Sequence, residues 1–308
     1  MAKQPADTAR QDEREASLYP IRTVSTLTGV NTVTLRAWER RYGLIRPTRT
    51  ASGHRLYTQA QIDLINRVLV LLDKGIAISQ VRAALDSTVE PQAPGEAQAG
   101  PWQRYLERMV SAIVRFDENG LEESYNEALS LYPVDMVTRH LLLPLLTELG
   151  QRWETAEGSI AEEHFFGVYL RNKLGARFHH RARGNTGPRL LLACLPGELH
   201  EIGVLLFALS THDNGFRIVL LGANMPLEDL PAVVRRAEID AIVLSGSIEP
   251  EPELLPERLP KLVAEARVPV CVGGLTSVRH RDAIVAGGAV PLGSDIEHGI
   301  RRLREITA

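Results

Sequence analysis

One histidine in this sequence has neighbours suited to ligand chemistry. His200 lies two residues after Glu198 and three before Gly203. Neutral imidazole is a common transition-metal ligand, and a carboxylate that accepts its second N–H fixes the tautomer and raises the basicity of the ring. Glycine has no Cβ, so a bulky ligand chain can approach the backbone at Gly203. The spacing indicates a ligand histidine with Glu198 as its partner.

The flanking residues show which elements must position this histidine. Residues 190–195 form an apolar run short enough for a buried parallel strand, and residues 204–209 have the apolar content of a helix. His200 is then expected at the carboxyl end of a strand, where open α/β sheets bind ligands. Alternatively, His200 is a polar loop residue, and Glu198 only supplies charge near a helix start. The hexapeptide alone leaves both interpretations open.

Two segments further along the chain favour the ligand interpretation. Glu198-x-His200-x-x-Gly203 resembles the cobalamin-binding motif of methionine synthase, corrinoid proteins and mutases, in which histidine replaces the benzimidazole as lower cobalt ligand. Those proteins add a serine-rich strand end and a Gly-Gly pair, and residues 241–247 and 270–274 stand here in that order. The resemblance implies that His200 binds cobalt and that small residues leave a slot for the displaced nucleotide tail. The other cofactor-binding residues expected here are Glu198, Glu201, Gly203, Ser245, Ser247, Gly273 and Gly274.

Composition is that of a soluble globular protein. With 308 residues, 44% of them hydrophobic and 24% charged, the chain has room for two or three domains. No apolar stretch reaches the roughly 18 residues that cross a membrane, and residues 1–17 lack the apolar core of a secretory signal. We therefore expect a cytoplasmic protein without a membrane partner. Cys194 and Cys271 fall inside predicted strands, so no disulfide is expected.

Charge is distributed unevenly along the chain. Residues 1–86 hold 13 Lys and Arg against 8 Asp and Glu, a net +5, and the remaining residues hold 22 against 30, a net −8. Such a separation suggests a nucleic-acid-binding head on an acidic body.

The basic head has the pattern of a helix-turn-helix. Residues 21–30 predict a short helix ended by Gly29, and Asn31 is a good N-cap for a helix over residues 32–41. A polar hairpin with basic residues on both arms follows at 48–57. The second helix is expected to expose Thr32, Thr34, Arg36 and Arg40 toward DNA. A basic helical face is most often merely solvated, so this pattern alone does not establish DNA binding.

A second resemblance strengthens the DNA-binding interpretation. Residues 35–44, followed by Arg46-Pro47 and residues 53–57, resemble the amino-terminal domain of MerR-family regulators, which are winged-helix proteins that bind operators as dimers. The resemblance places Arg36 and Arg40 in the major groove. It also implies that the flanking phosphates are held by Arg49, His54, Arg55 and Tyr57. Residues 58–85 continue as two helices broken at Gly75, as in that family.

The predicted fold class is multidomain, with a MerR-type winged helix-turn-helix, a four-helix bundle and a doubly wound, flavodoxin-like α/β domain. The bundle follows from apolar residues at three- and four-residue spacing, and the α/β domain from about five strands that alternate with helices. No Gly-x-Gly-x-x-Gly follows the first strand, so a dinucleotide fold is disfavoured. The expected segments are a disordered tail (1–18), the winged domain (19–86), a linker (87–101), the bundle (102–183) and the α/β domain (184–308).

The bundle carries a second candidate constellation, Trp153 followed after nine residues by Glu163-His164. Taken alone, these residues are most simply core and surface. However, the order of winged helix, bundle with Trp-x9-Glu-His and cobalamin-binding domain resembles the CarH-like and LitR-like photoreceptor regulators. In that family these three residues surround the upper ligand of adenosylcobalamin, so the resemblance implies a bundle that caps this cofactor.

The function implied is a light-responsive transcriptional repressor and not an enzyme. The family forms a homo-oligomer, a dimer or tetramer, on operator DNA in the dark and releases the DNA when light breaks the cobalt–carbon bond. One alternative is a regulator that senses cobalamin without light. The other is a corrinoid methyl-transfer subunit or mutase, which the helix-turn-helix and the lack of a barrel-sized substrate domain disfavour.

One position departs from the family. In its best-known light-responsive members the residue after the bundle tryptophan is a histidine that takes the upper cobalt position after photolysis, and here it is Glu154. A carboxylate is a harder ligand than imidazole and should bind cobalt less well. We therefore expect a lit state without the family's second histidine ligand, unless His164 replaces it.

Overall fold

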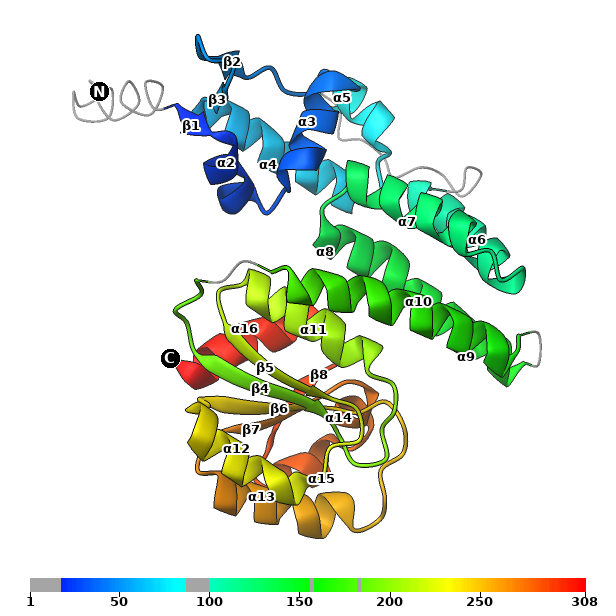
Figure 1. Ribbon diagram of the computed structural model, residues 1–308, viewed down its shortest axis with the longest axis vertical. Coiled ribbons are helices and arrows are strands. Elements are labelled where there is room, and N and C mark those ends of the chain that lie inside the picture. Colours follow the sequence, from blue (N-terminus) through cyan, green and yellow to red (C-terminus); the bar gives the residue numbers. More distant parts are fainter. Residues whose placement is uncertain (1–17, 87–99, 156–157, 182–183) are drawn as a thin grey trace, which may run out of the picture. The chain divides into compact units, whose positions relative to one another are not determined.

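The computed structural model describes residues 18–86, 100–155, 158–181 and 184–308, the side chains of Trp153 and Glu154 excepted (Figure 1). The expected tail and linker fall almost wholly outside these residues. The chain divides into two compact units, residues 1–165 and 166–308. The division differs from the three expected domains because the winged domain packs against the first helices of the bundle and shares a unit with them.

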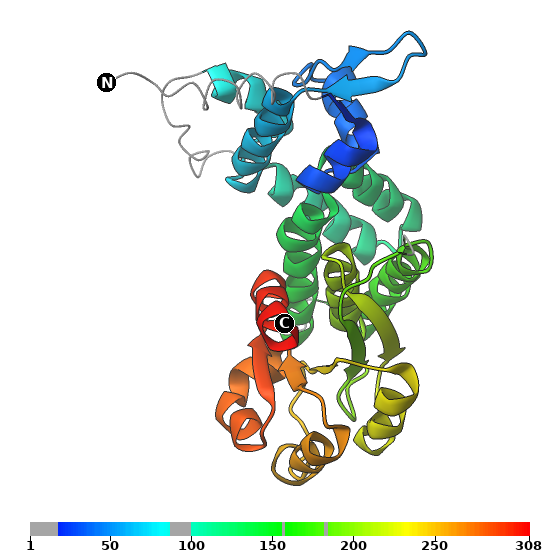
Figure 2. The same cartoon turned by 90° about the vertical axis from the view of Figure 1, so that its left-hand side faces the viewer.

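The amino-terminal part is a winged helix-turn-helix. Its strands are β1 (Tyr19–Pro20), β2 (Thr48–Arg49) and β3 (Arg55–Tyr57), antiparallel in the order β1-β3-β2. Its helices are α2 (Ile21–Thr28), α3 (Thr32–Arg40), α4 (Gln59–Asp73) and α5 (Ile78–Asp86). Gly29 ends α2 at a left-handed φ of 71°, and the Asn31 side chain accepts a hydrogen bond from the Thr34 amide at 2.8 Å. Both predicted helix ends are thus confirmed. The hairpin formed by β2 and β3 is seen at the top of Figure 2.

The middle of the chain is helical. Its helices are α6 (Pro101–Val114), α7 (Glu118–Leu131), α8 (Val134–Val137), the π-helical turn η1 (Thr138–Leu142), α9 (Leu143–Glu154) and α10 (Ile160–His179). Because Thr138 and Leu143 keep right-handed helical angles, α8, η1 and α9 form one continuous helix. The described residues of this region therefore contain four helical segments, as predicted. In the described part of the chain, no helix combines the length and apolar character needed to cross a membrane.

The carboxyl-terminal part is a doubly wound parallel sheet, as predicted. Its strands are β4 (Arg189–Cys194), β5 (Arg217–Gly222), β6 (Ala241–Ser245), β7 (Val270–Gly273) and β8 (Val290–Gly293), in the order β5-β4-β6-β7-β8. The helices that connect them are α11 (Ile202–Asp213), α12 (Leu230–Ala237), α13 (Leu259–Ala266), α14 (Leu275–Arg279), α15 (Arg281–Ala286) and α16 (Ile296–Thr307). Short helical turns precede α12 and α13, at η2 (Leu227–Asp229) and η3 (Leu254–Arg258).

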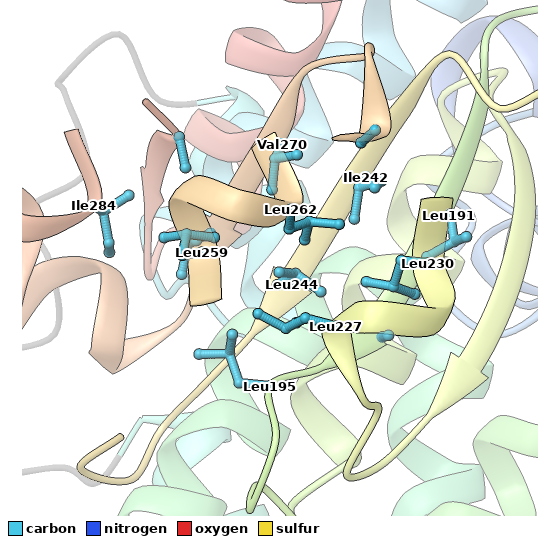
Figure 3. Packing of buried hydrophobic residues seen from close by; sticks show 14 of the residues in the cluster. Leu191, Leu195, Leu227, Leu230, Ile242, Leu244, Leu259, Leu262, Val270 and Ile284 are labelled. Atoms are coloured by element: carbon cyan, nitrogen blue, oxygen red, sulfur yellow. The ribbon is translucent and has the colours of Figure 1, made fainter. Parts of the chain in front are cut away.

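Two apolar layers hold this sheet. On β4, Leu191 and Ala193 pack in the layer with α12 and α13, and Leu190, Leu192 and Cys194 pack in the layer with α11 and α16. Figure 3 shows the first layer, where Leu230 and Leu262 meet Ile242 and Leu244 of the central strand. A parallel sheet buried on both faces explains why β4 and β6 are continuously apolar. Its polar groups therefore gather at the strand ends.

Candidate functional site

The loop that follows β4 is fixed at both its sides. The Cys194 thiol donates to the backbone oxygen of His200 at 3.9 Å, below the loop. The Gly197 amide donates to the side-chain oxygen of Asn224 at 2.8 Å, and the Asn224 amide donates to the Glu198 carbonyl at 2.8 Å. The loops after β4 and β5 therefore hold each other at the carboxyl edge of the sheet, and His200 is carried on backbone that is tied at several points.

Glu198 is the centre of a hydrogen-bond network at this edge. Its side chain is only 1% exposed. One carboxylate oxygen accepts from the His200 amide at 2.8 Å and from His200 Nδ1 at 2.7 Å. The other accepts from the amide and hydroxyl of Ser247, each at 2.6 Å, and from the Ile248 amide at 3.2 Å. The carboxylate thus joins the loop after β4 to the end of β6.

The network keeps Glu198 ionised and orients the imidazole. Burial acts to raise the pKa of Glu198, but the hydrogen bonds from His200 and Ser247 outweigh it and lower that pKa to about 2. Since an ionised carboxylate only accepts, His200 Nδ1 carries the proton in this pair, and Nε2 is the nitrogen suited to a metal. The His200 side chain is 58% exposed. The arrangement combines a fixed tautomer with access for a large ligand.

Glycines shape the strand ends beside this network. A Cβ at Gly246 would lie 2.6 Å from Thr276 Oγ1 and 2.7 Å from Leu195 Cδ1, so no larger residue fits there. Gly274 has a φ of 84°, and a Cβ on it would collide with the Gly246 carbonyl. At Gly203 a Cβ would meet only Ser245 Oγ, at 3.9 Å. The ends of β6 and β7 are thus closely packed, and the first turn of α11 faces Ser245 with little side-chain bulk.

The other expected residues of this edge have different surroundings. Glu201 caps α11, and its carboxylate lies 3.3 Å from Arg171 Nη1 on α10. Ser245 is half-buried at the end of β6. The Ser247 hydroxyl bonds to Glu198, so Ser247 acts on a ligand at His200 through that carboxylate. A Cβ at Gly273 would make only ordinary contact, 3.7 Å from the Gly293 carbonyl.

Sequence reasoning missed two residues that hold this edge. Asn224 has a φ of 48° and ties the loop after β5 to Gly197. Thr276 is 1% exposed and donates to the Ile248 carbonyl at 3.1 Å, which fixes the loop after β6. Asn224 had a signal, because asparagine tolerates left-handed backbone at a strand end. For Thr276 the only signal in the sequence was its position two residues after the Gly-Gly pair.

The residues expected above a cofactor belong to the other unit. Trp153 and Glu154 are the last two residues of α9, and both side chains lie outside the described residues. Glu163 is half-buried and His164 is exposed, both near the start of α10. The roles assigned to Trp153, Glu163 and His164 stay predictions.

Most predicted DNA contacts lie on the surface of the winged domain. Arg36, Arg40 and His54 are exposed, and Thr32 is partly so. Glu39 on α3 receives Arg49 Nη2 at 3.0 Å and the Nε of Arg55 in a close ion pair. Burial acts to raise the pKa of Glu39, but the hydrogen bonds from Arg55 and Arg49 hold it below its usual range. Glu39 therefore sets the direction in which both arginines leave the wing.

Two predicted DNA contacts, Thr34 and Tyr57, are buried, and the expectation that they are accessible is wrong. The Thr34 side chain faces α7 and donates to the Leu129 carbonyl at 3.2 Å, while Trp38 Nε1 donates to the Leu131 carbonyl at 2.9 Å. Thr34 lies one turn before Trp38, so both share the face that packs on α7. Tyr57 is fully buried because the strand places its ring in the core, and this burial raises the pKa of Tyr57 to about 12.

Comparison with protein families assigns each part of the chain. Residues 19–88 match the MerR HTH family regulatory protein model. Residues 105–177 and 188–294 match two models that are each described as a B12 binding domain. The helical region and the α/β domain that carries His200 therefore both belong to cobalamin-binding families.

Two curated relatives match nearly the whole chain. The HTH-type transcriptional repressor CarH of Myxococcus xanthus is 32% identical over 272 residues, which cover 85% of this chain and 91% of CarH. The HTH-type transcriptional repressor CarA of the same organism is also 32% identical over 272 residues, covering 87% and 91%. Among solved structures, a monomethylamine corrinoid protein of Methanosarcina barkeri has a TM-score of 0.54 at 21% identity, covering 66% of this chain and 99% of its own.

Proposed function

The chain belongs to the CarH-like family of MerR-type transcriptional regulators, and on that premise we propose that it is a light-responsive repressor whose chromophore is adenosylcobalamin. Both relatives that match nearly its whole length are repressors, which confirms the expectation of a regulator and not an enzyme. It is thus a cobalamin-binding transcription regulator. The adenosyl form, the response to light and the assembly on DNA are the proposed part.

The observation that carries the proposal is the pair formed by Glu198 and His200. The residues fit a corrinoid: an oriented imidazole is 58% exposed, a buried carboxylate fixes its tautomer, and small residues line the adjacent strand ends. When bound, adenosylcobalamin supplies visible absorption and a cobalt–carbon bond that light can break. His200 would hold the cobalt through Nε2.

Each residue of the edge has a separate task in this proposal. Glu198 keeps the proton on Nδ1 of His200, and Ser247 keeps Glu198 in place. Gly203 and Ser245 leave room for the nucleotide tail beside α11. Trp153, Glu163 and His164 are proposed to enclose the adenosyl group.

The winged domain would carry the operator contacts. Arg36 and Arg40 are proposed to read base edges from α3, while Arg49, His54 and Arg55 hold phosphates. The protein would exchange between an assembled state, a dimer or tetramer, and a dissociated one, and binding of the cofactor would favour the assembled state. Loss of the adenosyl group would remove that bias and release the DNA.

Size-exclusion chromatography of the full chain tests this function. We expect a larger assembly with adenosylcobalamin in the dark than without cofactor or after green light. The matched control is hydroxocobalamin, which lacks the adenosyl group and should give the same elution in dark and light. An elution volume that depends on neither cofactor nor light would contradict the proposal.

A second candidate is a regulator that senses cobalamin without responding to light. Glu154 favours it, because the family histidine that takes the upper cobalt position in the lit state is missing at this position. Cofactor-dependent assembly that is equal in the dark and in the light would assign this function.

A further inference from the structure

A second pocket lies in the α/β unit, at the edge of the sheet where the strands begin. Its volume is about 410 Å³. The polar side chains that line it are His179, Arg181, Asn185, Arg189, His212 and Arg217. They come from the end of α10, the segment before β4, the first residues of β4 and β5, and the end of α11. The sheet separates this pocket from His200, which follows the opposite end of β4.

The strand register brings two arginines side by side. Arg189 and Arg217 are the first paired residues of the parallel strands β4 and β5, so their side chains leave the sheet on the same side. Like charges at neighbouring positions destabilise a sheet unless an anion lies between them. Arg181 adds a third guanidinium, which lies 3.6 Å above the Phe178 ring.

Two carboxylates lie close to the pocket, and each contacts an arginine. Asp240 accepts from the Arg189 amide at 2.6 Å and lies 3.9 Å from Arg217 Nη2, but it is 49% exposed. Asp213, next to His212, pairs with Arg177 at 2.7 Å. No acidic residue lines the pocket among the residues that the structure describes. Asp240 therefore balances the charge of the Arg217 guanidinium only in part.

Backbone carbonyls hold all three arginines in position, and that of Phe178 accepts from Arg181 Nη1. Arg189 Nη1 donates to the Ala237 carbonyl at 2.8 Å, and Arg217 Nε donates to the Gly187 carbonyl at 2.8 Å. A guanidinium has five N–H donors, so each contact fixes a side chain and leaves further donors for a ligand. Pre-organised guanidinium groups match the oxygens of phosphate in paired hydrogen bonds.

A buried histidine completes the lining. His212 is 8% exposed, and its Nδ1 lies 2.9 Å from Asn185 Nδ2, which also donates to the carbonyls of His212 and Phe216. Because an amide nitrogen only donates, Nδ1 accepts and the ring proton is on Nε2. Burial lowers the pKa of His212, so the ring is neutral near pH 7. His212 thus offers an N–H donor held by Asn185.

We infer that this pocket is a second ligand site, built for the phosphate groups of a small molecule such as a polyphosphate or a nucleotide. Three guanidinium groups supply the charge, and His212 supplies an oriented neutral donor. The volume exceeds that of a single phosphate, so a diphosphate or a larger ester fits. This site is independent of the proposed light response.

Titration calorimetry of the full chain, without cobalamin and without DNA, tests the inference. The ligands are pyrophosphate, ADP and adenosine. We expect saturable one-to-one binding of pyrophosphate and ADP and none of adenosine. Arg217→Gln and Arg181→Gln should each weaken binding about tenfold or more. The matched control is Arg67→Gln, which removes the same charge from an exposed position on α4.

The outcomes separate the two sources of phosphate. ADP that binds about tenfold more tightly than pyrophosphate would assign a nucleotide, and equal affinities would assign the phosphate groups alone. Absence of saturable binding, or parental affinity in both arginine variants, would overturn the inference. If circular dichroism shows that Arg217→Gln fails to fold, the affinity of Arg181→Gln tests the inference, because Arg181 does not lie in a strand.

Discussion

Two carboxylates organise two regions of this protein, one in each unit, and they do so differently. Glu198, at the carboxyl edge of the parallel sheet, is 1% exposed and accepts hydrogen bonds from an imidazole, a hydroxyl and backbone amides. Glu39, on α3 of the winged domain, is 16% exposed and pairs with the guanidinium groups of Arg49 and Arg55. Both pKa values are below their usual range, that of Glu198 at about 2.

The difference lies in what each carboxylate does with its charge. The Glu198 carboxylate accepts from the His200 imidazole, so its negative charge acts on that ring. The charge of Glu39 is offset by two cations on a hairpin at the surface. Deep burial fixes a geometry, while under the proposed function the partly exposed arginines exchange Glu39 for a DNA phosphate. A rigid hydrogen-bond network suits a cofactor that stays bound, and exchangeable ion pairs suit a ligand that binds and dissociates.

Removal of the imidazole should have the largest effect. His200→Ala takes away the proposed cobalt ligand. We expect cobalamin affinity to fall by more than about 100-fold, because loss of a residue that only hydrogen-bonds a metal ligand typically lowers affinity about 10- to 100-fold. Absorption titration with adenosylcobalamin measures it. His180→Ala, at an exposed histidine directly after α10, is the matched control. A spectrum and affinity equal to those of the parent would remove His200 from the site.

Loss of the buried charge should have the next largest effect. Glu198→Gln keeps the shape but turns an acceptor into an NH₂ group that faces other donors, either His200 or Ser247. We expect cobalamin affinity to fall about 10- to 100-fold. Ser247→Ala leaves the backbone donors of Glu198 in place and should cost less. A larger loss from Ser247→Ala than from Glu198→Gln would reverse the assigned roles.

The stability that Glu198 provides should depend on pH. Its pKa falls from an ordinary 4.5 to about 2 on folding, so its ionised form stabilises the fold above pH 4.5. That contribution, roughly 3 kcal/mol, should be lost as the pH falls from 4.5 through 2. Urea unfolding at several pH values should show the gap between the parent and Glu198→Gln narrowing over this window. A gap that stays constant would mean that the charge of Glu198 adds no stability.

The basic residues of the winged domain should separate into two classes. Arg55→Ala should weaken binding to all DNA sequences and flatten the salt dependence by about one unit of slope, because it removes a phosphate contact. Arg36→Ala should also relax base preference, at a cost of about 1–3 kcal/mol for the cognate operator. Fluorescence anisotropy with cognate and scrambled duplexes at several salt concentrations distinguishes them. Equal operator binding by a chain that lacks residues 1–86 would refute both assignments.

The smallest effect is expected where α3 meets α7. Trp38→Phe removes the hydrogen bond to the Leu131 carbonyl and leaves that acceptor buried, so the free energy of unfolding should fall by about 1–3 kcal/mol. Chemical denaturation measures the change, with Thr34→Val as a second probe of the same face. Unchanged stability in both variants would mean that these two contacts do not stabilise the unit.

Much of the fold and of the cofactor edge could be predicted because local signals agreed with tertiary structure. Gly29, Asn31 and the apolar runs of the five strands each act within a few residues, and Glu198 reaches His200 inside one loop. Thr34 and Tyr57 were misplaced because their surroundings depend on packing against α7 and within the winged core. The arginine pocket was not predicted because Arg189 and Arg217 become neighbours only through the register of β4 and β5.

Operator binding by the loaded protein, dark against lit, tests the central claim most directly. One sample of the full chain with adenosylcobalamin would be divided, one half illuminated with green light, and both assayed by mobility shift on the same operator DNA. The account predicts a slow-migrating complex in the dark that disappears after illumination, and no such complex for His200→Ala in either condition. A complex that forms equally in the dark, in the light and with His200→Ala would contradict it.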